Sequence, residues 1–129
     1  MLDTCAIVWD AIEPNQLSDK AKKAINRADE FNALIISDIS VWEVSMLIKR
    51  NRLSIESTPS HFLNLYLQTR NISVIQISPE IAELSVNFDE SINKDPADRI
   101  ISATSIIQNA QLVTADKNLI ASEMIETVW

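Results

Sequence analysis

The chain has 129 residues, 47% of them hydrophobic, and its 11 basic and 18 acidic residues give a net charge of −7. This length and composition fit one domain with a buried core, residues 1–129, and the negative charge argues against a protein that holds nucleic acid mainly by positive potential. It does not exclude an enzyme that meets nucleic acid through bound cations. Glycine is absent, which excludes the Walker loop and the dinucleotide fingerprint, because both need glycine where backbone approaches phosphate.

The single cysteine, Cys5, permits no internal disulfide and suits a reducing compartment. The sequence starts without a basic leader, and its longest uncharged stretch, 100–115, is interrupted by polar residues. We therefore expect a cytoplasmic protein with no signal peptide and no membrane association.

Short apolar runs alternate with stretches of helical periodicity along the chain. Residues 1–3 are interpreted as the end of a first strand. Further strands are predicted at 33–36, 73–77, 111–114 and 124–128, and helices at 18–30, 40–50, 59–70, 79–87 and 96–109. Strands that alternate with helices of this length indicate parallel pairing and an α/β sandwich.

Helix starts are marked by a capping residue followed by proline or an acid. The predicted caps are Ser18, Ser40, Thr58, Ser78 and Asp95. In a chain without glycine, asparagine is predicted to turn the backbone between elements. The candidates are Asn15, Asn32, Asn51, Asn71, Asn93 and Asn109.

Four acids, Asp3, Glu43, Asp98 and Asp116, fall at predicted strand ends or helix starts. Each also has a purely structural interpretation: Asp3 as a strand-end acid, Ser40 and Glu43 as a capping box, Asp98 facing a helix dipole, and Asp116 capping a helix that begins at position 117. In right-handed β-α-β units, helices that follow strands begin at one edge of the sheet, where α/β folds place ligands. The four acids are therefore expected to lie together.

A carboxylate cluster needs a compensating interaction. Two carboxylates about 5 Å apart repel by roughly 3 kcal/mol at an effective dielectric near 20, more than the roughly 1 kcal/mol that a cap returns. The cluster therefore requires raised pKa values or a bound cation. Oxygen donors alone favour Mg²⁺ or Mn²⁺, and Mg²⁺ often shares its shell with substrate phosphate, which fits phosphodiester hydrolysis.

Four segments resemble the PIN domain, and in particular the VapC-type ribonuclease toxins of toxin–antitoxin pairs. They are 1–9 (MLDTCAIVW), 37–44 (SDISVWEV), 95–104 (DPADRIISAT) and 114–116 (TAD). The resemblance implies a three-layer α/β sandwich with a central parallel sheet in the order 3-2-1-4-5. It also implies that Asp3, Glu43, Asp98 and Asp116 are the catalytic, metal-binding acids.

The resemblance further implies a Mg²⁺- or Mn²⁺-dependent endoribonuclease acting on single-stranded or loop RNA. Its implied partners are a cognate antitoxin with a basic segment, which inserts near the carboxylates, and a second copy of the toxin. Thr4 and Thr114 are expected to orient groups beside the metal ligands, although ordinary strand-end hydroxyls are equally compatible. Asp95 is expected to cap a helix or to support the site, and Arg99 to pair with a site carboxylate, a phosphate or a surface acid.

Several alternatives remain open from the sequence. A catalytically inactive PIN-fold scaffold retains the same motifs, whereas a phospho-acceptor receiver domain is disfavoured because 73–78 contains no aspartate. The basic run 49–52 is expected to close a helix and point away from the site, and residues 20–27 to flank an RNA path. Trp9 and Trp42 are interpreted as packing residues rather than base-stacking residues.

Overall fold

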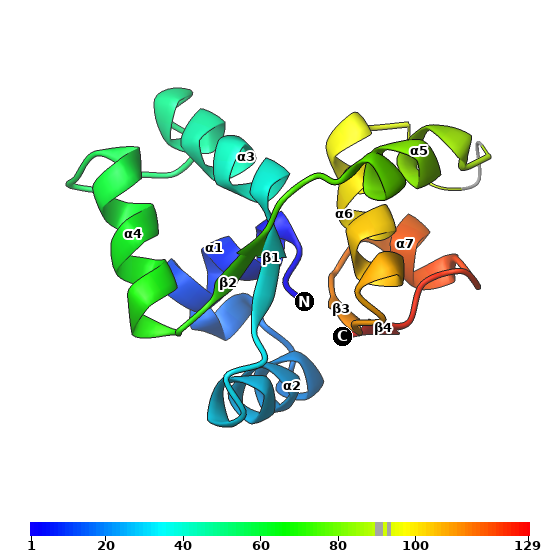
Figure 1. Cartoon of the computed structure of the whole chain (residues 1–129). Helices are drawn as coiled ribbons and strands as arrows, with labels where there is room; N and C mark the ends of the chain where they lie inside the picture. Colours follow the sequence, from blue (N-terminus) through cyan, green and yellow to red (C-terminus); the bar gives the residue numbers. More distant parts are fainter. Residues whose placement is uncertain (90–91, 93) are drawn as a thin grey trace.

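The computed structural model describes residues 1–89, 92 and 94–129. Helices and short strands alternate along these residues (Figure 1). The helices are α1 (Thr4–Ile12), η1 (Pro14–Gln16), α2 (Asp19–Glu30), α3 (Asp38–Lys49), α4 (Pro59–Thr69), α5 (Pro79–Asn87), α6 (Pro96–Ile107) and α7 (Lys117–Ala121). The strands are β1 (Ile35–Ser37), β2 (Ser73–Ile75), β3 (Leu112–Val113) and β4 (Thr127–Val128).

The central sheet consists of two parallel strand pairs joined by residues 1–3. β1 pairs with β2 from Ile35↔Ser73 onward, and β3 pairs with β4. Between the pairs, the Leu2 N–H donates to the Ile35 carbonyl at 3.0 Å, and the Asp3 N–H donates to the Val113 carbonyl at 3.1 Å. The resulting order, β2-β1-(1–3)-β3-β4, is the predicted order 3-2-1-4-5.

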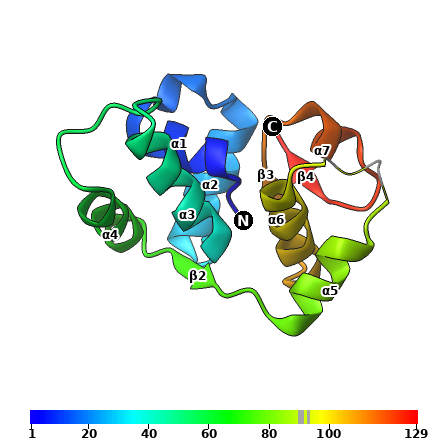
Figure 2. The same ribbon diagram turned by 90° about the horizontal axis from the view of Figure 1, so that it is seen from above.

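Side chains alternate between two apolar cores, one on each face of the sheet. Leu2, Ile36 and Val113 join a core with residues of α1 to α4, whereas their neighbours Met1 and Leu112 join a second core with residues of α5 to α7. Figure 2 shows α1 to α4 grouped on one side of the molecule and α5 to α7 on the other. The predicted three-layer α/β sandwich is confirmed.

The predicted caps and turns largely form as expected. The Ser18 hydroxyl accepts from the Ala21 N–H at 3.1 Å, and Thr58, Ser78 and Asp95 cap α4, α5 and α6 in the same way. Four asparagines have positive φ and turn the chain after a helix: Asn32 (52°), Asn51 (53°), Asn71 (49°) and Asn109 (48°). Asn15 instead lies in η1, and Asn93 lies outside the described residues.

One helix was not predicted, and one predicted helix start is wrong. Residues 4–12 were not predicted as a helix, yet they form α1, which is held by the burial of Ala6 and Ile7. α3 begins at Asp38, and its N-cap, Ser37, makes no side-chain cap bond. Ser40 therefore lies inside the helix, and the predicted Ser40–Glu43 capping box does not form.

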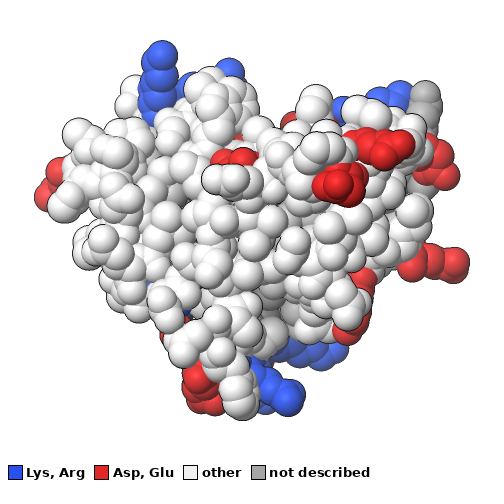
Figure 3. Space-filling view, in the orientation of Figure 1, with Lys and Arg blue, Asp and Glu red and all other residues white. Residues whose placement is uncertain are grey.

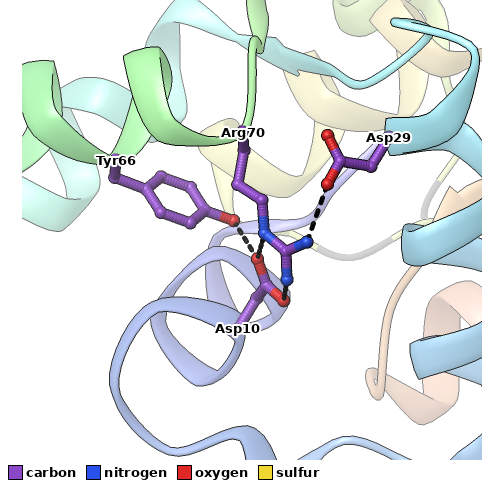
Figure 4. A network of polar contacts seen from close by, with 4 residues as sticks. All are labelled: Asp10, Asp29, Tyr66 and Arg70. Carbon is purple, nitrogen blue, oxygen red and sulfur yellow. Dashed lines mark hydrogen bonds and ion pairs between the residues drawn. The ribbon is translucent and has the colours of Figure 1, made fainter.

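A charged network joins α1, α2 and α4 (Figure 4). Arg70, directly after α4, donates to Asp10 Oδ1 at 2.6 Å and Oδ2 at 2.9 Å, and to Asp29 at 2.9 Å. The Tyr66 hydroxyl donates to Asp10 Oδ2 at 2.8 Å. The Asp10 side chain is only 4% exposed. The network therefore supplies the hydrogen bonds and the opposite charge that this buried carboxylate no longer receives from water.

Among the described residues, no helix combines the length and the apolar character that crossing a membrane requires. Figure 3 shows that the basic side chains on this face gather at separate places rather than in one continuous patch.

Candidate active site

All four predicted acids line one cavity of about 930 Å³. Asp3 is the residue before α1, and Asp116 is the N-cap of α7, so both follow central strands. Asp98 lies in the first turn of α6, and Glu43 lies on α3. The cavity is therefore at the carboxyl edge of the sheet, between the two halves where the strand order reverses, as predicted for an α/β ligand site.

Asp3 is fixed by its burial and by one threonine. It is 4% exposed, and the Thr114 hydroxyl donates to Asp3 Oδ2 at 2.7 Å. Burial raises the pKa of Asp3, and the charge of Asp116 raises it further, whereas the Thr114 hydrogen bond opposes the shift. Thr114 thus holds Asp3 in one orientation and favours its ionised form.

Glu43 is positioned by the second threonine. The Thr4 hydroxyl lies 2.6 Å from Glu43 Oε2 and 3.1 Å from the hydroxyl of the buried Ser40. Burial raises the pKa of Glu43, with further contributions from the charges of Asp95 and Asp3, and the Thr4 hydrogen bond again opposes it. Thr4 and Thr114 therefore each orient a different carboxylate.

The pKa of Asp98 is raised by burial and by every other acid of the cavity. Burial raises its pKa to about 7, and the nearby charges of Asp3, Asp95, Asp116 and Glu43 add to the shift. Ionisation of one acid thus opposes that of the others, which is the electrostatic signature of a carboxylate cluster.

Asp116 and Asp95 each cap a helix and also line the cavity. Asp116 Oδ1 accepts from the Asn118 N–H at 2.7 Å and from the Leu119 N–H at 3.1 Å. Asp95 Oδ1 accepts from the Ala97 N–H at 2.9 Å. The predicted capping role is confirmed for Asp95 and Asp116, and it is compatible with their position in the cavity lining.

The prediction for Arg99 is not supported by its contacts. Its guanidinium donates to backbone carbonyls at the end of α5, including Ser85 at 2.9 Å and Phe88, and lies 5.8 Å from the Phe88 ring centroid. Because Arg99 is one position beyond Asp98, it projects from a different side of α6 and meets α5.

The acidic end of the cavity has the donors of a hard-cation site. Its carboxyl groups offer oxygen donors, which Mg²⁺ and Mn²⁺ prefer over the thiol of Cys5 that lines the same space, and a cation would relieve the repulsion that helps to raise the carboxyl pKa values. Within residues 1–89, 92 and 94–129, however, no three His, Cys, Asp or Glu side chains converge closely enough to hold an ion as they stand. The donor chemistry fits such an ion, and binding one requires the carboxyl groups to draw together.

The remainder of the cavity was not predicted. α3 runs along it, so that Ile39, Trp42, Met46 and Leu47 form an apolar wall, and Arg50 and Arg52 line the same space. The expectation that 49–52 points away from the site is therefore wrong. Trp42 is 58% exposed, which also contradicts its interpretation as a packing residue. The helical spacing of Trp42, Met46 and Arg50 indicates from the sequence that they share one face of α3, but it does not indicate what that face lines.

The fold and the cavity define an α/β domain that gathers carboxylates where the order of its parallel strands reverses. The chain belongs to the PIN domain family, whose model matches residues 1–122.

Three similar proteins extend the comparison. The chain is 33% identical over 119 residues to Ribonuclease VapC22 of Mycobacterium tuberculosis, an alignment that covers 92% of this chain and 88% of that protein. The structure of VapBC2 from Rickettsia felis bound to a DNA fragment from their promoter has a TM-score of 0.74 at 16% identity, with 98% and 95% of the two chains covered. A toxin–antitoxin complex from Klebsiella pneumoniae has a TM-score of 0.62 at 22% identity, with 96% and 92% covered. The two structural likenesses support the fold.

Proposed function

We propose that this chain is a metal-dependent endoribonuclease, the toxin of a toxin–antitoxin pair, which hydrolyses phosphodiester bonds in single-stranded or loop RNA. The observation that carries the proposal is the gathering of Asp3, Glu43, Asp98 and Asp116 in one cavity, with the pKa of Asp98 raised to about 7. The similarity to Ribonuclease VapC22 supports RNA as the substrate.

Each side chain has a role in this proposal. Asp3, Glu43, Asp98 and Asp116 would hold Mg²⁺ or Mn²⁺, which when bound supplies an activated water and neutralises phosphate charge. Thr114 and Thr4 keep one oxygen each of Asp3 and Glu43 in a fixed direction. Burial and the neighbouring acids raise the pKa of Asp98 to about 7, so without a bound ion this carboxyl is mostly ionised only above about pH 7.

The acidic cavity also indicates what kind of protein partner binds this chain. An acidic cavity in a chain of net charge −7 is complementary to a basic segment of an antitoxin. The Klebsiella pneumoniae structure of similar fold is a toxin–antitoxin complex, which supports an antitoxin partner. The homodimer and the cytoplasmic location remain predictions.

One observation favours a second candidate, a catalytically inactive PIN-fold binding or scaffold domain. In the described part of the chain the acidic side chains do not converge into a preformed metal site. Calorimetric titration with Mn²⁺ separates the two candidates, because a nuclease site binds the ion and a scaffold with separated acids gives no heat of binding.

The direct test is RNA cleavage with and without Mg²⁺, repeated with Asp98→Asn. Cleavage is expected to need the ion and to fall at least about 100-fold in the variant, because a metal ligand is lost. Asp19→Asn makes the same chemical change in the first turn of α2, outside the cavity lining, and is expected to cleave normally. Cleavage that survives chelation of the metal or the Asp98 substitution contradicts the proposal.

A further inference from the structure

One face of α3 forms a continuous wall from the carboxylates to the far end of the cavity. Glu43 lies at the acidic end, and Trp42, Met46 and Arg50 follow one another at four-residue steps on the cavity side. With a rise of 1.5 Å per residue, Arg50 is about 10 Å further along the helix axis than Glu43. The acidic end of the cavity is therefore separated from the arginine end by more than the width of one phosphate group.

The turn after α3 brings a second arginine to the same place. Asn51 has a φ of 53°, and the N–H groups of Arg52 and Leu53 return to the Leu47 carbonyl at 2.9 and 3.3 Å. Leu53 is buried and anchors the turn. Arg50 and Arg52, on either side of Asn51, consequently both line the cavity.

These two guanidinium groups are available to a ligand. Arg70 and Arg99 are committed to Asp10 and to the end of α5. By contrast, no side-chain hydrogen bond or ion pair joins Arg50 or Arg52 to another described residue. Two such arginines at one end of a cavity suit an anion, because the guanidinium group matches phosphate geometry with paired hydrogen bonds.

We propose that Arg50 and Arg52 form a second subsite that binds a phosphate of the RNA strand away from the bond that is cut. This inference rests on the proposed function for the identity of the ligand. Between the two ends, the exposed Trp42 ring offers a surface on which a base stacks. The strand would thus run along α3, from the carboxylates to the turn at Asn51.

Binding is tested in an Asp98→Asn background with Mg²⁺ present, so that the RNA stays intact. The probe is a short, fluorescently labelled single-stranded RNA of mixed sequence, and anisotropy is followed over a range of salt concentrations. Arg50→Gln with Arg52→Gln is expected to lower affinity about tenfold and to reduce the slope of log K against log salt by about 0.7, because one phosphate contact on a single strand is lost. Arg50→Lys with Arg52→Lys is expected to restore the slope but not the full affinity.

The matched control is Lys23→Gln with Arg27→Gln, which removes the same charge from α2. The sequence predicts an RNA path beside 20–27, but Lys23 and Arg27 line a separate pocket with Phe31 that shares no lining residue with the carboxylate cavity. A strand that runs along α3 does not contact that pocket, so affinity is expected to change less than about threefold, through long-range charge alone. Equal losses in the two double variants, or unchanged binding in the Arg50/Arg52 variant with a normal thermal unfolding curve, overturn the proposal. Weaker antitoxin binding with intact RNA affinity also overturns it and assigns the arginines to the protein partner.

The outcome is independent of the proposed cleavage. If wild-type protein neither binds Mn²⁺ nor cuts RNA, the proposed function fails, while the loss of RNA affinity in the Arg50/Arg52 variant still supports the subsite. If cleavage is metal-dependent and this variant binds RNA normally, the subsite alone is wrong.

Discussion

Asp98 is a half-buried acid whose ionisation is linked to folding. Burial and the surrounding carboxylates raise its pKa to about 7 in the folded chain, compared with about 3.9 for an unfolded aspartate. Between about pH 4 and pH 7 the folded state therefore holds a proton that the unfolded state lacks. The free energy of unfolding contributed by this group is highest below about pH 4, declines as the pH rises through this interval and stays low above about pH 7.

Asp98→Asn is therefore expected to stabilise the metal-free protein. At about pH 8 the gain in free energy of unfolding should be about 1–2 kcal/mol, a value reduced because the side chain is partly solvated, and at about pH 4 it should approach zero. Urea unfolding in the presence of a chelator measures both values. Asp19→Asn should show no comparable gain at either pH, and an equal gain for Asp98→Asn at both pH values would contradict the assignment.

For single residues, the positions of the acids could be predicted from the sequence. Asp3, Asp98 and Asp116 follow strands or start helices, and backbone topology alone brings such positions to one edge of a sheet. Arg99 could not be placed in the same way. Its long side chain reaches whatever packs beside α6, and that neighbour, α5, is set by tertiary packing.

The asparagine turns decide where four elements end. Asn32, Asn51, Asn71 and Asn109 hold positive φ angles, which asparagine tolerates better than other residues with a β-carbon. The composition supports this prediction, since a chain without glycine has few other residues suited to a left-handed turn.

Replacing Asn109 by alanine is expected to cost about 1 kcal/mol, because alanine pays the full penalty of the left-handed conformation. Asn109→Gly should be close to neutral, because glycine adopts that conformation freely but gains more freedom when unfolded. Asn26→Ala, inside α2, is the matched control and should be neutral or slightly stabilising. Thermal unfolding measures all three, and equal losses for Asn109→Ala and Asn109→Gly would point to the lost side chain instead.

The start of α3 and the existence of α1 were missed for different reasons. α1 is an apolar segment with three buried residues, Thr4, Ala6 and Ile7, and no side-chain cap bond, so its helix depends on packing rather than on a local signal. In α3, Ser40 and Glu43 match the capping-box spacing, but Thr4 of α1 binds both side chains. The hydrogen bonds from Thr4, which is far away in the sequence, thus replace the predicted local bond between Ser40 and Glu43.

The network around Arg70 stabilises the molecule as a whole, because it ties three helices together (Figure 4). Arg70→Met leaves the carboxylate of Asp10, 4% exposed, without its ion partner. The expected loss in free energy of unfolding is about 3 kcal/mol.

Adding Asp10→Asn to Arg70→Met should recover part of this loss, because the buried charge is then gone and Tyr66 still has an acceptor. Urea unfolding of the single and double variants gives the comparison. A double variant no more stable than Arg70→Met would show that the cost comes from lost packing rather than from an unpaired charge.

The strand order was available from the resemblance, whereas the shape of the cavity was not. Predicting the wall formed by Trp42, Met46 and Arg50 requires the direction in which α3 crosses the sheet. That direction depends on how Val44 and its neighbours pack into the core, which spacing along a single helix does not determine.

Residues 1–3 join the two strand pairs and also carry one of the clustered carboxylates. The hydrogen bonds of Leu2 and Asp3 to Ile35 and Val113 couple the two strand pairs, and the same short segment carries Asp3. Any opening that breaks these bonds separates the two halves and misplaces a carboxylate at once. Slow deuterium uptake by these two amides would therefore report an intact sheet and an assembled carboxylate cluster in a single measurement.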